Sequence, residues 1–276
     1  MNPLTLGYSP CPNDTFIFYA LVHGLVEGKL SFKERLEDVE TLNRLVLAGE
    51  LDVSKISYHL LGFVREEYCL LRSGGALGRG CGPLVIAREP GSPSALRGRK
   101  IAVPGRYTTA LLLLRLFDPC LDNFIVMPFD RIMGAVAGGE ADAGLIIHES
   151  RFTFQEQGLV QLLDLGEWWE RETGQPIPLG GIVAKRSLGS PTVDSIERAL
   201  ALSVAYASAH PAAAISYIRA HSQEMSDEVC AAHIGLYVNN YSHDLGREGE
   251  AAVSALLSRG EKAGLIPPSG KNLFVA

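Results

Sequence analysis

Three features that would point to a particular class of protein are missing from this sequence: a long apolar run, an excess of positive charge and a leader segment. Its 276 residues contain no apolar run that approaches the roughly 18 residues of a membrane span. Acidic residues outnumber basic ones by 31 to 25, and the net charge of −6 argues against nucleic acid or an anionic membrane as the main partner. Because no basic segment followed by an apolar one precedes the first expected strand, we expect a cytoplasmic protein without a membrane partner.

Cysteine is scarce and poorly spaced for a disulfide framework or a metal site. The five cysteines form no Cys-x-x-Cys pair, and an odd number would leave one of them unpaired. We therefore expect reduced thiols and no structural metal. Residues 72–82 hold five glycines, which would let the backbone approach a ligand, but they lack the lysine and the spacing of a nucleotide-binding loop.

Apolar residues, in contrast, are plentiful. They make up 47% of the chain against 20% charged residues, so a sizeable core is possible, either in one large domain or in two of ordinary size. The spacing of apolar residues predicts strands and helices in alternation as far as about residue 184 and mainly helices from residue 194 onward. This pattern indicates the α/β class with a helical C-terminal part.

Residues 9–15 form the stretch with the densest set of reactive and polar side chains. They follow an expected strand at residues 4–8 and precede an apolar helical run at residues 16–22, so Asn13 or Asp14 is the predicted helix cap. Ligands of α/β proteins commonly bind at such a junction between a strand end and a helix start. We therefore expect Ser9, Asn13 and Asp14 to form one wall of a binding site.

A weak internal repeat divides the chain into two similar halves. The pattern Gly-Glu-x-Asp at residues 49–52 recurs at residues 139–142, and each copy precedes a short apolar strand that ends in polar residues. The loop before residue 16 corresponds in the same way to the loop before residue 110. Two related α/β halves explain both correspondences.

These halves predict two lobes around a central cleft, joined by two hinge strands. We assign residues 1–86 and 184–276 to the first lobe, which includes the C-terminal helices, and residues 87–183 to the second lobe. The boundary rests on the Pro-, Gly- and Ser-rich residues 89–94. The polar loops of both lobes are expected to face the cleft, which would close around a ligand by hinge motion.

This arrangement resembles the type II periplasmic-binding-protein fold, and five stretches allow a closer match. Residues 7–16, 37–43, 55–58, 72–80 and 144–152 resemble the signature motifs of the 1,4-dihydroxy-6-naphthoate synthase family, of the futalosine route to menaquinone. The resemblance extends over essentially the whole chain. Long motifs in the same order are far more specific than a single glycine pattern.

The resemblance implies a cofactor-independent lyase that acts on cyclic dehypoxanthine futalosine, a small molecule with an aromatic carboxylate. The products would be 1,4-dihydroxy-6-naphthoate and dihydroxyacetone. His148, in the Ile-Ile-His-Glu-Ser motif, would be the general base. The positions that would contact the substrate are Lys55, Ile56, Ser57, Thr108 and Thr109.

The residues themselves leave several of these roles open. His148 follows an apolar strand and could abstract a proton there. His59 is the fallback base, although the pattern of residues 57–61 is more typical of the start of a helix. Lys55 could pair with the substrate carboxylate or could be a solvated charge. Thr108 and Thr109 could bind substrate oxygens or could merely cap a helix.

Other polar residues receive simpler interpretations. Glu149 could orient the imidazole of His148 or point to solvent. Cys11 could be a nucleophile at a helix start, but the sequence supplies no base for it. His233 and His243 lie in the helical tail, where we expect them at the surface, and Trp168 and Trp169 are expected in the core.

Three other functions share parts of this pattern. A solute-binding protein of the same fold would be expected to carry an export signal or a lipid-attachment cysteine, and the effector domain of a transcription regulator would need a DNA-binding segment before the first strand. A chorismate dehydratase of the same pathway is the nearest alternative. The motifs at residues 9–14 and 146–150 favour the naphthoate synthase.

Overall fold

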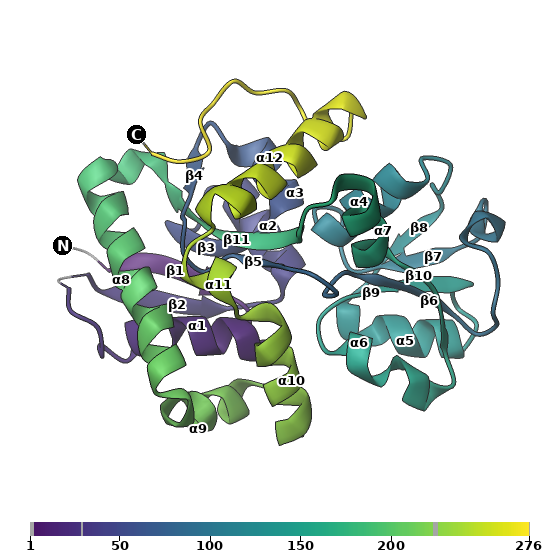
Figure 1. Cartoon of the computed structure of the whole chain (residues 1–276), viewed down its shortest axis with the longest axis horizontal. Coiled ribbons are helices and arrows are strands. Elements are labelled where there is room, and N and C mark those ends of the chain that lie inside the picture. The colour runs from purple at the N-terminus through teal and green to yellow at the C-terminus, as the bar shows by residue number, and fades with distance from the viewer. Residues whose placement is uncertain (1–2, 29, 223–225, 276) are drawn as a thin grey trace.

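The computed structural model describes residues 3–28, 30–222 and 226–275 and contains two β-sheets with helices packed around each (Figure 1). The first sheet has the strand order β2-β1-β3-β11-β4, and β5 pairs with β11. Its strands are β1 (Leu4–Tyr8), β2 (Phe32–Leu36), β3 (Val53–Ser57), β4 (Tyr68–Leu70), β5 (Ala76–Gly78) and β11 (Ile177–Lys185). The second sheet has the order β10-β6-β9-β7-β8. Its strands are β6 (Leu84–Ala87), β7 (Ile101–Val103), β8 (Phe124–Val126), β9 (Ala143–Ile146) and β10 (Val160–Asp164).

The predicted repeat is present in the topology of the two sheets. In the first sheet β2-β1-β3-β11 contains two parallel pairs followed by one antiparallel pair, and β8-β7-β9-β6 repeats this pattern in the second sheet. The repeated Gly-Glu-x-Asp pattern also has a structural reason. The Asp52 carboxylate accepts a hydrogen bond from the backbone N–H of Thr5, and that of Asp142 accepts one from Lys100 N–H, both at 2.9 Å. Each aspartate thus anchors the corresponding strand of its own sheet, β1 in the first and β7 in the second.

The helices follow the predicted order. Those before the C-terminal part are α1 (Pro12–Val22), α2 (Val39–Leu47), α3 (Tyr58–Val64), α4 (Thr109–Phe117), α5 (Phe129–Ala137), α6 (Ser150–Thr153) and α7 (Leu165–Thr173). Those of the C-terminal part are α8 (Ser190–Ala209), α9 (Pro211–His221), α10 (Asp227–Tyr237), α11 (Asn240–His243) and α12 (Gly246–Lys262). Helices α8, α9 and α10 contact α1, so this part of the chain packs back on the first lobe as expected.

The start of α1 differs from the prediction. The helix begins at Pro12, whose fixed φ suits the first helical position, and Cys11 is the N-cap residue without a side-chain cap bond. Asn13 and Asp14 therefore lie inside the first turn, and the prediction that one of them caps the helix was wrong. Their side chains are free to face the neighbouring elements instead.

The chain changes sheet a few residues before each predicted lobe boundary. Strand β6, which begins before residue 87, belongs to the second sheet, and all of β11, which begins before residue 184, belongs to the first sheet. The first crossing contains Gly82, where a Cβ atom would lie only 2.2 Å from the backbone nitrogen of Gly166. Glycine at this position allows the crossing segment to pass directly against the start of α7.

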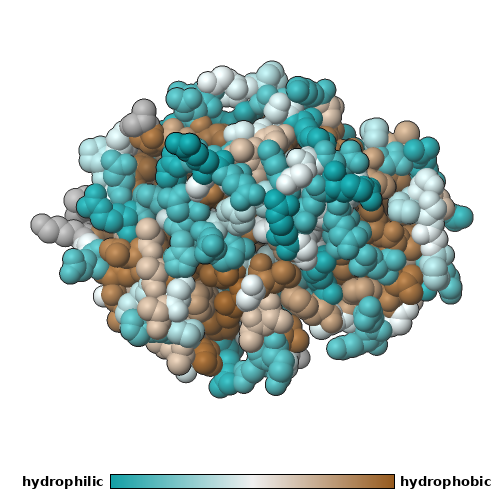
Figure 2. All heavy atoms as spheres, viewed as in Figure 1, coloured by the Kyte–Doolittle hydropathy of each residue, from teal (hydrophilic) through white to brown (hydrophobic). Residues whose placement is uncertain are grey.

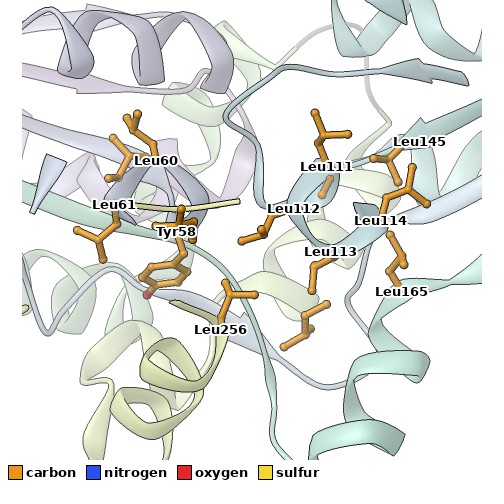
Figure 3. Packing of buried hydrophobic residues seen from close by; sticks show 14 of the residues in the cluster. Tyr58, Leu60, Leu61, Leu111, Leu112, Leu113, Leu114, Leu145, Leu165 and Leu256 are labelled. Atoms are coloured by element: carbon orange, nitrogen blue, oxygen red, sulfur yellow. The ribbon is translucent and has the colours of Figure 1, made fainter. Parts of the chain in front are cut away.

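One apolar cluster extends across both lobes. Figure 3 shows the consecutive leucines of α4, Leu111–Leu114, lying between the side chains of α3 and α12 and those of β9 and α7. Leu112, Leu113 and Leu114 are fully buried. Trp169 is also fully buried, as expected, and packs in the same cluster. This continuous packing fixes α4, and with it the cleft-facing loop before α4, relative to the first lobe.

Hydrophilic side chains cover much of the face shown in Figure 2, and apolar residues are gathered in its lower part near α9 and α10. No single helix in the described ranges has both the length and the apolar composition of a membrane span. Helices α8 and α9 reach those values only together, and they are bent by 103° where they meet. All five cysteines lie in the described ranges and are free thiols, as predicted.

Candidate active site

A cavity between the two lobes brings together residues from both halves of the chain. It has a volume of about 660 Å³ when its opening to solvent is included. The expected base and all of the residues expected to bind the substrate line it: Ser9, Asn13, Asp14, Lys55, Ile56, Ser57, Thr108, Thr109 and His148. They come from the ends of β1, β3 and β9 and from the first turns of α1 and α4, which meet where the lobes face each other.

Lys55 is already paired with a carboxylate of the protein. Its Nζ atom lies 3.0 Å from Oδ1 of Asp14 and donates a hydrogen bond to the carbonyl oxygen of Gly74 at 3.1 Å. Both side chains are almost completely buried. The alternative that Lys55 is a solvated charge was therefore wrong, and a substrate carboxylate would have to compete with Asp14 for the ammonium group. Asp14 also accepts a 2.7 Å hydrogen bond from the hydroxyl of Ser9.

His148 lies two residues beyond the end of β9 in an unusual backbone conformation. Its φ of 57° makes it the only non-glycine residue with positive φ in the described parts of the chain. Nδ1 lies 3.7 Å from the sulfur of Cys11, and the ring of Phe129 packs edge-on against the imidazole at 5.0 Å. Burial lowers the pKa of His148, and the nearby carboxylates of Glu149 and Asp14 only partly oppose this effect. The imidazole is thus neutral at neutral pH.

Glu149 follows neither of the two interpretations that the sequence left open. Its Oε2 atom is buried rather than solvated, and it has no hydrogen-bond partner among the residues that the structure describes. The carboxylate therefore acts on the pKa of His148 through its charge and not through a hydrogen bond to the ring.

Cys11 does have a base beside it, which the sequence did not reveal. However, burial strongly raises the pKa of the thiol, and the Glu149 carboxylate raises it further. Cys11 is consequently protonated at neutral pH. Its contact with Nδ1 of His148 makes it a residue that orients the imidazole, and nothing in this geometry favours a nucleophilic thiolate.

The hydroxyl groups of the cavity are not equally free to bind a ligand. Thr108 accepts a hydrogen bond from Leu111 N–H at 3.3 Å and so caps α4, while the hydroxyl of Thr109 donates to the carbonyl oxygen of Leu179 at 2.6 Å. In contrast, Oγ of Ser57 accepts a 3.2 Å hydrogen bond from the amide of Asn43 and retains its own O–H for a ligand. At α4 the first-turn backbone N–H groups other than that of Leu111 are the groups available to an anion.

His59 does not belong to the cavity lining. It lies in the first turn of α3, as predicted, where Nδ1 is 3.2 Å from the carbonyl oxygen of Thr108. Burial lowers the pKa of His59 to about 4. Its contacts join the two lobes, so the structure gives no support to His59 as the fallback base.

His233 is the main cavity residue that sequence reasoning missed. It was expected at the surface, but it is fully buried on α10 and lines the cavity together with Tyr237, one helical turn further on. The spacing of four residues between these two side chains places them on the same helix face, and this was the signal in the sequence that could have suggested a buried role.

A protein built from two α/β lobes that enclose such a cleft has the periplasmic-binding-protein-like fold, which confirms the predicted fold class. A solved protein from Candida albicans, described as having the generic periplasmic binding protein fold, matches with a TM-score of 0.70 at 16% identity over 98% of this chain and 92% of its own. Protein AF1704 from Archaeoglobus fulgidus matches with a TM-score of 0.89 at 38% identity over 96% and 98% of the two chains.

Comparison at the level of sequence identifies the family. The model of a family described as "Menaquinone biosynthesis" matches residues 4–262. The 1,4-dihydroxy-6-naphthoate synthase of Thermus thermophilus is 55% identical over the full length of both chains, and that of Streptomyces coelicolor is 48% identical over 98% of this chain and 96% of its own. The chain belongs to the 1,4-dihydroxy-6-naphthoate synthase family, as its motifs predicted, and it is an enzyme of menaquinone biosynthesis.

Proposed function

We propose that this enzyme is a lyase that converts cyclic dehypoxanthine futalosine to 1,4-dihydroxy-6-naphthoate and dihydroxyacetone. The observation that carries the proposal is the position of His148, a half-buried neutral imidazole at the wall of an interlobe cavity that is also lined by every other residue that the resemblance implies. The names of the two curated relatives support the naphthoate as the product. Independence from a cofactor stays a prediction that rests on the resemblance.

In this mechanism His148 removes a proton from the sugar-derived ring of the substrate. Elimination then breaks the bonds that hold the three-carbon unit, and formation of the aromatic naphthalene supplies driving force. Cys11, beside Nδ1, and Phe129, against the ring face, hold the imidazole in place. If Nδ1–H donates to the sulfur, the lone pair is on Nε2, the atom that would accept the proton.

The rest of the cavity suits the orientation and desolvation of the substrate. Because Lys55 is neutralised by Asp14, we place the substrate carboxylate at the first turn of α4, where backbone N–H groups and the helix dipole favour a negative charge. The free hydroxyl hydrogen of Ser57 would bind another substrate oxygen. Closure of the lobes around the substrate would exclude water from the proton transfer.

The test is product formation from cyclic dehypoxanthine futalosine, followed by liquid chromatography with mass detection. We expect naphthoate from the wild type and a loss of about 10²- to 10⁴-fold in kcat for His148→Ala, the usual contribution of a general base. His23→Ala is the matched control, because His23 is exposed at the end of α1 and should leave the rate unchanged.

Each outcome has a distinct consequence. Naphthoate at equal rates from the wild type and His148→Ala would keep the reaction and refute the histidine base. The absence of naphthoate from folded wild-type protein would refute the proposed reaction, and chorismate would then be the compound to test.

A further inference from the structure

A second imidazole stands directly beside the proposed base. His233 is fully buried on α10, and its ring lies nearly parallel to that of His148, with an interplanar angle of 10° and 6.2 Å between the ring centroids. The two residues come from different lobes, since α10 packs against α1 of the first lobe and His148 follows β9 of the second. The mechanism above gives His233 no role.

A chain of hydrogen bonds determines which nitrogen of His233 carries the proton. The ammonium group of Lys55 pairs with Asp14 at 3.0 Å, and the amide nitrogen of Asn13 donates to the same carboxylate oxygen of Asp14 at 2.9 Å. The opposite orientation of the Asn13 amide would bring two oxygens into contact. The amide oxygen of Asn13 is therefore the atom that faces Nε2 of His233, at 2.9 Å, and Nε2 must be the protonated donor.

It follows that Nδ1 of neutral His233 is a hydrogen-bond acceptor. This atom is buried and has no hydrogen-bond partner among the residues of the described ranges. Burial, reinforced by the nearby His148, lowers the pKa of His233 to about 3, so the ring does not gain a second proton at neutral pH. A buried acceptor without a partner is unfavourable, and such atoms in native proteins usually have a partner that belongs to the function.

We propose that His233 contacts the substrate and that its Nδ1 atom accepts a hydrogen bond from a hydroxyl group of the sugar-derived portion. The inference rests on the proposed function, because that substrate carries hydroxyl groups on the part that must lie near His148. A neutral acceptor cannot bind the substrate carboxylate, whereas a hydroxyl donor satisfies it. His233 thereby orients the reacting ring toward the base and selects substrates that carry this hydroxyl.

Two substitutions separate this role from a purely structural one. The amide nitrogen of glutamine reaches the position of Nε2, so His233→Gln can preserve the hydrogen bond to Asn13 but lacks the acceptor at Nδ1. The amide of asparagine reaches the position of Nδ1, so His233→Asn can preserve the acceptor but leaves the oxygen of Asn13 without its donor.

We expect His233→Gln to unfold at the wild-type temperature and to lose about 10- to 100-fold in kcat/KM, because the substrate hydroxyl is left without its partner. His233→Asn should unfold at a lower temperature and keep a higher kcat/KM than His233→Gln. Wild-type kcat/KM in His233→Gln would overturn the inference, and so would a loss of activity that parallels the loss of thermal stability in both variants.

Deoxy analogues of the substrate test the hydroxyl itself. Removal of the hydroxyl that contacts Nδ1 should lower kcat/KM of the wild type to the value of His233→Gln and change the variant little. If no analogue removes the difference between the two proteins, the assignment is wrong. Turnover of the complete substrate by the wild type separates the role of His233 from the proposed function. If the wild type forms no naphthoate, the proposed function is refuted. If the wild type forms naphthoate but the variants or analogues do not behave as expected, only the role of His233 is refuted.

Discussion

At the scale of single residues, the site is organised around a histidine in an unfavourable backbone conformation. A φ of 57° costs a non-glycine residue on the order of 1–3 kcal/mol unless the surrounding structure compensates it. Here Cys11 contacts one nitrogen of His148 and Phe129 packs against the ring, so the side chain is held from two sides. The turn directs the imidazole into the cleft rather than along the strand direction.

The lowered pKa of His148 predicts a specific pH dependence. The neutral, proton-accepting form should dominate at neutral pH, because burial moves the pKa below the ordinary value of 6.5. The kcat/KM should therefore be constant around neutral pH and fall as the pH decreases through this lowered pKa. A profile of kcat/KM against pH measures the pKa of the free enzyme, and an ascending limb centred above 6.5 would contradict a desolvated histidine base.

At the scale of elements, the two halves use the same device to hold their first strands. Asp52 and Asp142 follow a helix that ends at a glycine with positive φ, and each then binds the backbone at the start of β1 or just before β7. Burial tends to raise the pKa of Asp52, but hydrogen bonds from Thr5 and Lys185 outweigh this effect, and the pKa is lowered overall. The carboxylate therefore stabilises the fold when it is ionised.

We expect Asp52→Asn to lower the free energy of unfolding by about 1 kcal/mol at neutral pH, the usual value of a partly exposed hydrogen bond to a charged group. Because the folded-state pKa lies below the unfolded value near 3.8, this stabilisation is present above that pH and is lost as the pH falls through the folded-state pKa. Urea unfolding at several pH values tests this.

Two further variants complete that experiment. Asp142→Asn examines the same anchor in the second lobe, and Asp122→Asn is an exposed control on the same lobe. A stability difference between the wild type and Asp52→Asn that persists unchanged in strong acid would show that the charge of the carboxylate is not its source.

At the scale of the whole molecule, the lobes are held together by contacts on both sides of the cavity. The buried carboxylate of Glu40, on α2 of the first lobe, accepts hydrogen bonds from the backbone N–H groups of Arg106 and Tyr107 in the second lobe, at 2.8 and 3.2 Å. Gly105 leaves room for it, since a Cβ atom there would lie 2.3 Å from the carboxylate. This contact fixes the loop that leads into the first turn of α4.

We expect Glu40→Gln to loosen the closed arrangement, because an amide has only one acceptor oxygen and its NH₂ group would face a backbone N–H. The loss of one buried bond is on the order of 1–3 kcal/mol, so KM should rise about 5- to 100-fold with a smaller change in kcat. Steady-state kinetics combined with small-angle scattering measures both the affinity and the opening.

Glu50→Gln is the control for that variant, since Glu50 is exposed and remote from the second lobe. A radius of gyration and a KM equal to those of the wild type in Glu40→Gln would show that the apolar core across the lobes is sufficient to keep them closed.

Much of this protein could be predicted from local patterns in the sequence. Apolar periodicity indicated the alternation of strands and helices, the Gly-Glu-x-Asp copies indicated two halves, and polar residues after the strands indicated the cleft. The site residues expected from these patterns and those implied by the family resemblance line one cavity. These features were accessible because helix and strand signals depend on neighbouring residues, and because strand ends and helix starts of each lobe lie on the side that faces the cleft.

Only the tertiary structure decided which of these side chains contact each other. Asn13 and His233 are 220 residues apart, and Cys11 and His148 are 137 residues apart. The periodicity of α10 shows that it is a helix but not which element its buried face meets, so His233 was expected at the surface. The ion pair of Lys55 with Asp14 likewise depends on how β3 and α1 are placed in space. Local patterns determined the elements, and the packing of the two lobes determined the chemistry of the cavity between them.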